Sequence, residues 1–160
     1  MKITRRSVLQ LSGVTLAIGL SGCSLRWPFG VRPPTIESQT IGVENAQCVG
    51  DEPRQHEVTV SYHAPNHRLS LEGALKTTSP CPNLFLTSDT GVGKSEIRDD
   101  AILLTIDPAT SEACEPCPAE VEYAATVTFD HDPSKVYIYH TEETDDGWKR
   151  VGPIETETID

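Results

Sequence analysis

The sequence has few basic residues, few large aromatic residues and almost no methionine. Lys and Arg together number 13 in 160 residues, against 24 Asp and Glu. Binding to nucleic acid or anionic lipid requires a basic surface, so this composition argues against both as partners. With two Trp and three Phe, the core must consist mainly of Val, Leu, Ile, Ala and Tyr. Met1 is the only methionine, which argues against a blue-copper site with its usual methionine ligand.

The chain also lacks an apolar run long enough to be a normal membrane span. The stretch from Val8 to Leu20 is 13 residues long. As a helix it would reach about 20 Å, against roughly 30 Å for the hydrocarbon core of a bilayer. A basic start at Lys2, Arg5 and Arg6 precedes it, and small residues follow it. This order of basic, apolar and small-residue regions is typical of a secretory signal peptide.

Two details of this segment predict how the protein is exported and where it stays. The pair Arg5-Arg6 resembles the twin-arginine export signal, which is read by a receptor. The Leu-Ser-Gly-Cys motif ending at Cys23 resembles a lipobox, whose cysteine is lipidated and becomes the first mature residue. Two acyl chains hold a protein stably, because each buried methylene contributes about 0.8 kcal/mol. We therefore expect removal of residues 1–22 and a membrane anchor at Cys23, on the outer face of the cytoplasmic membrane.

Without the signal peptide the chain is more acidic still. Residues 23–160 keep ten bases against all 24 acids, which leaves a net charge near −14. This surface composition looks like that of proteins from salt-loving archaea, whose acidic surfaces stay solvated and repel one another in brine. We therefore interpret the acidity as an adaptation for solubility in salt and not as evidence of a cation site.

A two-residue period dominates the chain after residue 55. In such a pattern every second side chain faces the core, which is typical of half-buried β-strands. The clearest case runs from Val121 to Phe129, with apolar residues at every odd position. Further strands are expected at 56–62, 69–77, 84–87, 102–106 and 136–140. No stretch has a convincing 3.6-residue period, so we predict an all-β fold, either an antiparallel β-sandwich (Ig-like) or a small barrel of six to eight short strands.

The composition divides the chain into four parts. Residues 1–22 are the predicted signal peptide, and residues 23–45 are an expected lipidated linker that contains three prolines. Residues 46–142 are the predicted β domain. Residues 143–160 are acidic and rich in turn-forming residues, and are expected to form a C-terminal tail, with an edge strand possible around Trp148.

Four cysteines follow the lipobox: Cys48, Cys81, Cys114 and Cys117. An even number of cysteines in an exported chain indicates a disulfide framework, with three possible connectivities. If the strands simply alternate up and down, all four cysteines lie at one end of the sheet. We expect two disulfides that join Cys48 and Cys81 to the other two cysteines. Each would stabilise the fold by roughly 2–4 kcal/mol.

Two alternatives use the same cysteines chemically. Cys48, Cys81, Cys114 and Cys117 could together form a four-thiolate zinc or copper site, although such sites usually have two Cys-x-x-Cys hooks and this chain has one. Cys114-Glu-Pro-Cys117 also resembles the redox pair of thiol oxidoreductases. A predicted strand follows this pair instead of the helix that would lower a thiol pKa, which weakens the redox reading.

Other motifs are better explained as turns. The segment around Lys94 resembles the end of a phosphate-binding loop, but Ser88 stands where that motif needs glycine. His63 and His67 have the spacing of a helical metal pair, with a proline and an asparagine between them. His131 lies between two aspartates in a turn. No nucleophile motif or haem-attachment motif is present, so we predict no enzyme activity, no cofactor and no nucleotide.

The region from Gly73 to His140 resembles a group of twin-arginine-exported lipoproteins of halophilic archaea whose activity is unassigned. The matching features are Gly73-Ala-Leu, Ser-Pro-Cys81, Cys114-x-x-Cys117, the alternating strand that ends at Phe129, and Pro133-x-x-Val-x-Ile-x-His140. The turn written Gly-Gly-Leu-Pro in that group is Asp-His-Asp-Pro here. The resemblance implies a surface lipoprotein with a small cysteine-containing β domain. It implies no particular activity.

These observations together predict a cell-surface lipoprotein that acts by binding or as a structural component. The expected partners are the membrane, through the lipid, and a protein or polysaccharide of the cell envelope. The alternatives are the metal-binding protein and the thiol oxidoreductase described above.

Overall fold

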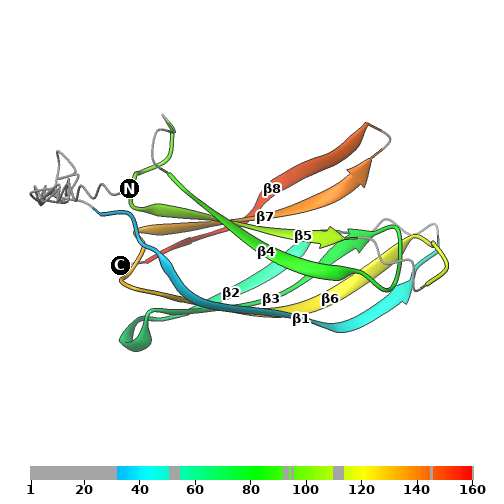
Figure 1. Cartoon of the computed structure of the whole chain (residues 1–160), viewed down its shortest axis with the longest axis horizontal. Helices are drawn as coiled ribbons and strands as arrows, with labels where there is room; N and C mark the ends of the chain where they lie inside the picture. The colour runs from blue at the N-terminus through cyan, green and yellow to red at the C-terminus, as the bar shows by residue number, and fades with distance from the viewer. Residues whose placement is uncertain are drawn as a thin grey trace, which may run out of the picture.

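The computed structural model describes residues 32–50, 55–91, 94, 96–109, 114–144 and 146–159. These residues form eight strands and one short 3-10 helix (Figure 1). The elements are β1 (Ile36–Cys48), β2 (Glu57–His63), η1 (Ala64–Asn66), β3 (Arg68–Thr77), β4 (Asn83–Thr90), β5 (Ala101–Ala109), β6 (Ala119–Phe129), β7 (Lys135–Thr144) and β8 (Gly147–Thr158). The described part of the chain has no helix long and apolar enough to cross a bilayer.

The strands form two four-stranded sheets that pack face to face. The first sheet has the order β1-β6-β3-β2 and the second has the order β4-β5-β7-β8. The sheets do not close into a barrel, so the β-sandwich prediction is confirmed and its barrel alternative is not. Pairing is antiparallel except between β5 and β7, which are parallel. The parallel pair arises because the chain leaves β5, crosses to the first sheet as β6, and returns beside β5 in the same direction.

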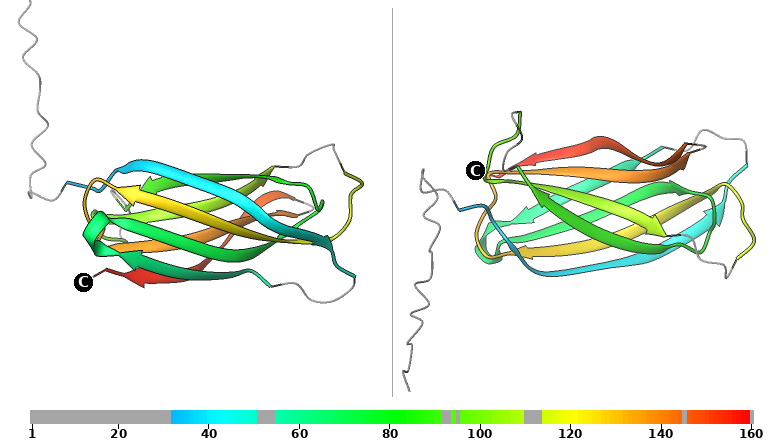
Figure 2. Two further views of the ribbon diagram at one scale, coloured as in Figure 1. Left: turned by 90° about the horizontal axis from the view of Figure 1, so that it is seen from below. Right: turned by 45° about the horizontal axis from the view of Figure 1, so that its top comes forward.

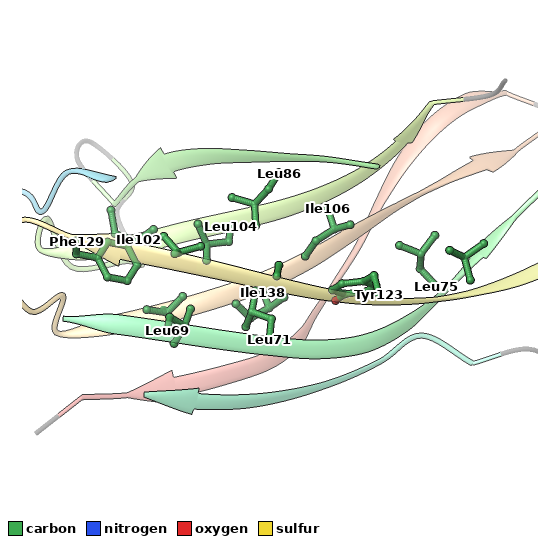
Figure 3. Close-up of a cluster of buried hydrophobic side chains, with 14 residues drawn as sticks. Leu69, Leu71, Leu75, Leu86, Ile102, Leu104, Ile106, Tyr123, Phe129 and Ile138 are labelled. Carbon is green, nitrogen blue, oxygen red and sulfur yellow. The ribbon is translucent and has the colours of Figure 1, made fainter. Parts of the chain in front are cut away.

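The core lies between the sheets and follows the period-2 pattern of the sequence. In β6 the odd-numbered residues from Ala119 to Phe129 are buried, as the sequence predicts. Successive side chains of a strand point to opposite faces, so these residues line one continuous apolar surface. They pack against Leu69, Leu71 and Leu75 of β3 and against residues of the second sheet (Figure 3). Burying each Leu or Ile contributes roughly 2 kcal/mol.

The segment predicted as a linker is in part the first strand. β1 starts at Ile36, well before the predicted domain start at residue 46, and pairs with β6 along its whole length. β1 is an edge strand whose side chains are mostly exposed, with only Ile36, Ile41 and Ala46 half-buried. Two register irregularities set these three residues five apart, so the period-2 signal is absent from the sequence.

The predicted acidic tail is also mostly a strand. β8 covers 12 residues and pairs with β7, so the expected edge strand is present and is much longer than the region around Trp148. A register irregularity opposite Tyr139 accommodates Gly152 and Pro153, where Gly152 has a φ of 122° that glycine adopts without strain. Proline and the bulge are both typical of an edge strand. These features conceal the strand in the sequence.

The sandwich has two distinct ends, which lie at opposite ends of its long axis in Figures 1 and 2. At the entry end β1 begins beside the β6–β7 turn, and β8 finishes. At the disulfide end β1 finishes at Cys48 and the cysteine-bearing loops gather. A strand of 13 residues spans roughly 40 Å, so β1 carries the chain from one end to the other.

Candidate functional site

The four cysteines of the β domain form two disulfides at one end of the sandwich. Cys48, which ends β1, is bonded to Cys117, with a Cα–Cα distance of 5.8 Å. Cys81, between β3 and β4, is bonded to Cys114, with a Cα–Cα distance of 5.9 Å. Both distances are usual for disulfides. The pairing is the one expected from the sequence, in which Cys48 and Cys81 each join one cysteine of the Cys-x-x-Cys pair.

This pairing corrects the two chemical alternatives. Every sulfur of the predicted four-thiolate metal site is bonded to another sulfur, so none is a thiolate ligand. Cys114 and Cys117 are bonded to different partners and do not form a redox pair. In the described ranges no group of three or more His, Cys, Asp or Glu side chains is placed to hold a metal ion.

A hollow of about 320 Å³ opens at the disulfide end. The end of β3, the loop before β6 and the end of β7 line it, through Lys76–Thr78, Pro116–Pro118, Glu142 and Glu143. Backbone and side-chain bonds fix these walls. The amide of Cys117 donates to the carbonyl of Thr78 at 3.0 Å, and the Thr78 hydroxyl donates to Glu143 at 2.8 Å.

Behind this hollow a chain of four polar side chains crosses the sandwich. The Tyr123 hydroxyl of β6 lies 2.8 Å from Nε2 of His140 in β7. Nδ1 of His140 lies 3.0 Å from Nδ1 of His56. Nε2 of His56 in turn lies 3.1 Å from Glu142 Oε2. The chain therefore runs from the first sheet into the second, then to the segment before β2, and ends at the rim of the hollow.

When both histidine rings are neutral, the acceptor at one end of this chain sets the direction of every hydrogen bond in it. A carboxylate only accepts, so Nε2 of His56 carries the hydrogen that it donates to Glu142. With both rings neutral, Nδ1 of His56 is then an acceptor, and Nδ1 of His140 must donate to it. Nε2 of His140 is left as an acceptor for the hydroxyl of Tyr123. This assignment follows from the bonding pattern and leaves every member satisfied.

The environment keeps His140 and Tyr123 neutral. Burial, with a smaller contribution from the neighbouring His56, lowers the pKa of His140 to about 3. Burial also raises the pKa of Tyr123 above its usual value. Both side chains are almost completely inaccessible to solvent. The chain therefore connects the two sheets through side chains that are almost entirely buried.

The sequence analysis did not identify this chain. The feature of the sequence that could have revealed it is the presence of two polar residues at inward positions of otherwise apolar strand patterns. Tyr123 occupies an inward position of the clearest strand, and His140 follows Val136 and Ile138 at the same parity. A histidine at an inward position needs a buried partner, because an unpaired buried polar group is costly. His56 has no comparable signal, because it lies just outside β2.

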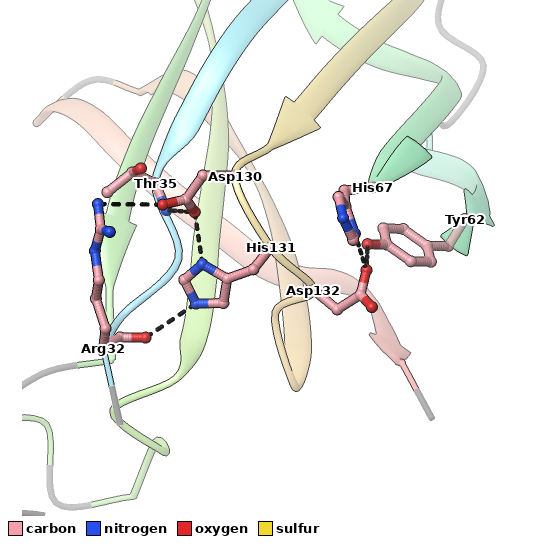
Figure 4. Close-up of polar contacts among 7 residues, drawn as sticks. All are labelled: Arg32, Thr35, Tyr62, His67, Asp130, His131 and Asp132. Atoms are coloured by element: carbon pink, nitrogen blue, oxygen red, sulfur yellow. Dashed lines mark hydrogen bonds and ion pairs between the residues drawn. The ribbon is translucent and has the colours of Figure 1, made fainter. Parts of the chain in front are cut away.

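At the entry end, the β6–β7 turn fastens the start of β1 (Figure 4). The amide of Thr35 donates to Asp130 at 2.8 Å, and Arg32 forms an ion pair with the same carboxylate at 3.3 Å. His131 contacts Asp130 at 2.8 Å, and its other ring nitrogen lies 3.0 Å from the carbonyl of Arg32. His131 and its neighbouring aspartates thus hold protein groups, which accounts for them without a cation.

The next residue of the turn fastens the β2–β3 connection. Asp132 accepts from the Tyr62 hydroxyl and from Nδ1 of His67, the latter at 2.6 Å. These two bonds lower the pKa of Asp132. His63 instead contacts Asn66 at 2.9 Å, so His63 and His67 do not converge on a common site. The interpretation of these histidines as turn residues agrees with the structure.

The remaining sequence motifs fall into two groups. Lys94, at the end of the segment that resembles a phosphate-binding loop, forms an ion pair with Asp89, consistent with an ordinary surface charge. The predicted export residues Arg5 and Arg6 and the predicted lipidation site Cys23 lie outside the described residues. Comparison with known proteins adds nothing to these observations, because no family, no curated protein and no solved structure matches the chain significantly.

Proposed function

We propose that the protein is a lipid-anchored binding domain of the cell envelope and that it presents its disulfide end away from the membrane. The observation that carries this proposal is the separation of the two ends. β1 begins at the entry end and reaches the disulfides roughly 40 Å away. A lipid at Cys23 lies on the N-terminal side of β1, so it would hold the entry end toward the bilayer.

The chemistry of the domain supports a location outside the cytoplasm. Two disulfides are typical of oxidising compartments and are rare in the cytosol. The anchor rests on the sequence of residues 4–23, which combines an arginine pair, a short apolar stretch and a lipobox-like motif. Membership of a family of halophile lipoproteins remains a prediction, which rests on the motifs between Gly73 and His140.

A binding role is favoured over catalysis by the state of the reactive side chains. The four cysteine sulfurs of the β domain are paired in two disulfides, and the buried His56–His140 pair is hydrogen-bonded to its own partners. The histidines of the entry end hold turns together.

Membrane fractionation of cells that produce Cys23→Ala tests the anchor. The parent protein should remain with the membrane after a high-salt wash, and the variant should appear in the soluble extracytoplasmic fraction. Replacement of Arg5 and Arg6 by lysine should retain the precursor in the cytoplasm. Membrane association that persists in Cys23→Ala would overturn the lipid anchor.

Fluorescence quenching tests the orientation. A fluorophore at position 66, in the β2–β3 turn, should be quenched by a quencher on lipid headgroups in vesicles. The same fluorophore at position 144, at the disulfide end, should be quenched much less. Equal quenching at both positions would contradict the proposed display of the disulfide end.

A further inference from the structure

The outer face of the second sheet carries exposed aromatic side chains. Phe85 is 54% exposed and Trp148 is 52% exposed. In β4 Leu84 and Leu86 pack toward the core, so Phe85 points outward. Trp148 lines a hollow with the outward-facing Thr141 and so belongs to the same face. Single exposed apolar residues are common on proteins, but two large aromatics on one face indicate contact with a partner.

A fixed carboxylate lies between these two rings. Asp107 pairs directly with Phe85 across the β4–β5 ladder. The hydroxyl of Thr87 donates to one of its oxygens and the hydroxyl of Thr141 donates to the other, both at 2.9 Å. Within the described ranges Asp107 forms no ion pair. Each oxygen keeps a free lone pair, so Asp107 is an oriented acceptor held in place by neutral donors.

The surface is hollowed beside this carboxylate. A depression of about 370 Å³ is lined by Asp107, Pro108, Ala109, Thr141 and Trp148. Its walls combine an aromatic ring and apolar surface with a small number of placed polar groups, which is typical of ligand sites. Phe85 lies beyond Asp107. Three strand spacings separate β4 from β8, so the aromatic positions span roughly 14 Å across the sheet.

A cationic side chain and a further aromatic ring extend this surface. Arg150 pairs with Thr141 across the β7–β8 ladder. Its guanidinium lies 5.2 Å from the centre of the Tyr139 ring, which faces outward on β7. Stacking of this kind orients a guanidinium and leaves N–H groups free to donate. The face therefore offers both an acceptor and donors beside aromatic rings.

The charge of the face narrows the class of ligand. At its outward strand positions three acids, Asp89, Asp107 and Glu143, stand against two bases, Lys135 and Arg150, so this face is close to neutral although the protein as a whole is strongly acidic. An anionic polymer would be repelled by the rest of the surface. A strongly basic partner would find an excess of only one acid on this face. A neutral ligand rich in hydroxyl groups fits both the charge balance and the mixture of acceptors, donors and rings.

We propose that this face binds a neutral polysaccharide strand of the cell envelope. The apolar C–H faces of the sugar rings would lie against Trp148 and Phe85. Sugar hydroxyls would donate to Asp107 and accept from Arg150, and bonds to such charged groups are stronger than neutral ones. The inference rests on the proposed function as an envelope-binding domain and names its ligand class.

Tryptophan fluorescence tests the proposal directly. The processed lipoprotein carrying Trp27→Phe, so that Trp148 is its only tryptophan, is reconstituted in phosphatidylcholine vesicles. The probe is the neutral polysaccharide fraction that protease digestion releases from the producing cells' own envelope. Saturable change in Trp148 emission is the expected result. Native affinity electrophoresis with the same fraction then measures the variants.

Variants on the two faces form matched pairs. Trp148→Ala and Asp107→Asn should each weaken retardation by about tenfold or more, and Phe85→Ala should weaken it severalfold. The controls are Val43→Ala, an exposed apolar residue of β1, and Glu72→Gln, an exposed acid of the first sheet. Both controls should bind like the parent. All variants should keep the parent melting temperature within about 2 °C.

Three outcomes would overturn the proposal. They are no emission change with no retardation, equal loss in the control variants, and binding confined to polylysine or to an envelope protein. The result is separable from the proposed anchor. Release of Cys23→Ala with no polysaccharide binding would reject the ligand class alone, and polysaccharide binding by a protein that is never anchored would reject the anchor alone.

Discussion

The outer faces of the two four-stranded sheets carry different side chains. The first sheet presents a hollow of about 520 Å³ whose charged lining is Glu44, Glu57, Glu72 and Glu122. Its other outward side chains are mainly threonine, serine and alanine. The second sheet presents Phe85, Tyr139 and Trp148 around one fixed carboxylate. Folding requires only that the inward residues are apolar, so the contrast between the outer faces reflects other demands on the protein.

The edge strand β1 of the first sheet is held by cross-links at both of its ends. The entry-end turn holds the start of β1 through Asp130, and the Cys48–Cys117 disulfide holds its end. The acidic face of this sheet keeps the domain solvated. We infer that the first sheet is the scaffold of the domain and that the second sheet is its contact surface. Substitutions in the scaffold should change stability, and substitutions on the aromatic face should change binding.

The largest expected effect is the loss of the disulfide that fastens the first sheet. Cys48 and Cys117 are 69 residues apart. A loop of that size should make their bond worth about 4 kcal/mol in unfolding free energy. Replacement of both by alanine should lower the urea midpoint accordingly, while the folded variant still binds through the second sheet. The matched pair is Cys81 and Cys114, whose shorter loop of 33 residues predicts a slightly smaller loss. Unchanged stability in both variants would contradict the scaffold role.

The next effect concerns the polar chain that joins the sheets. His140→Leu should lower the unfolding free energy by roughly 3 kcal/mol, because it leaves buried partners without a hydrogen bond. Adding Tyr123→Phe removes one of these unsatisfied groups and should recover part of the loss. A urea double-mutant cycle measures the coupling. Additive losses would show that the bond between His140 and Tyr123 contributes no specific stability.

The same chain predicts a pH dependence. The pKa of His140 is about 3 in the folded protein, against about 6.5 in the unfolded chain. The unfolded state therefore binds the extra proton first, and stability falls as the pH drops from 6.5 toward 3, by at most about 1.4 kcal/mol per pH unit. Asp132 and Asp130 have lowered pKa values and add their own losses near pH 4 and below. Comparing unfolding of the parent and of His140→Gln between pH 7 and 5 separates the contribution of His140, and the variant should show the flatter curve. A parent curve already flat in that range would exclude a buried neutral His140.

A smaller effect is expected where the chain packs closely against Tyr123. A Cβ on Gly73 would lie 2.5 Å from the carbonyl oxygen of Glu57 and 2.7 Å from the Tyr123 hydroxyl. Gly73→Ala should therefore cost about 1–3 kcal/mol. Gly42→Ala, on the edge strand β1 of the same sheet with open space around it, is the matched control and should change stability little. Equal shifts of the melting temperature in the two variants would mean that the close approach at Gly73 does not affect the free energy of unfolding.

The smallest effects on stability should come from the outer faces themselves. Phe85→Ala and Glu72→Gln are both at exposed positions and should stay within about 0.5 kcal/mol of the parent. Thermal unfolding checks this directly. A loss above about 1 kcal/mol in Phe85→Ala would mean that the aromatic face is part of the structure of the domain.

The parts of the fold that the sequence predicts are those in which inward and outward residues alternate. β6 and β7 were predicted because Val121, Phe129, Val136 and Ile138 sit at regular inward positions. β1 was missed because its irregular register breaks that alternation. The direction of β7 was also not predictable, because the sequence does not show that β6 belongs to the other sheet.

Some of the functional features could likewise be predicted from the sequence, and others could not. The disulfide end was predictable, because the order of strands and cysteines places all four sulfurs together. The polar chain and the aromatic face were not, because each depends on contacts between strands distant in sequence. Phe85, Asp107 and Trp148 belong to three strands. Only the sheet order β4-β5-β7-β8 brings them side by side.

The most direct test of the division between scaffold and contact surface is a map of backbone amide chemical shifts for the processed lipoprotein in detergent micelles, titrated with the neutral polysaccharide fraction of its own envelope. We predict shifts at the outward positions of the second sheet, strongest around Asp107, Thr141 and Trp148, with the first sheet unaffected. Shifts concentrated around Glu72 and Glu122 instead, or absent from both faces, would contradict it.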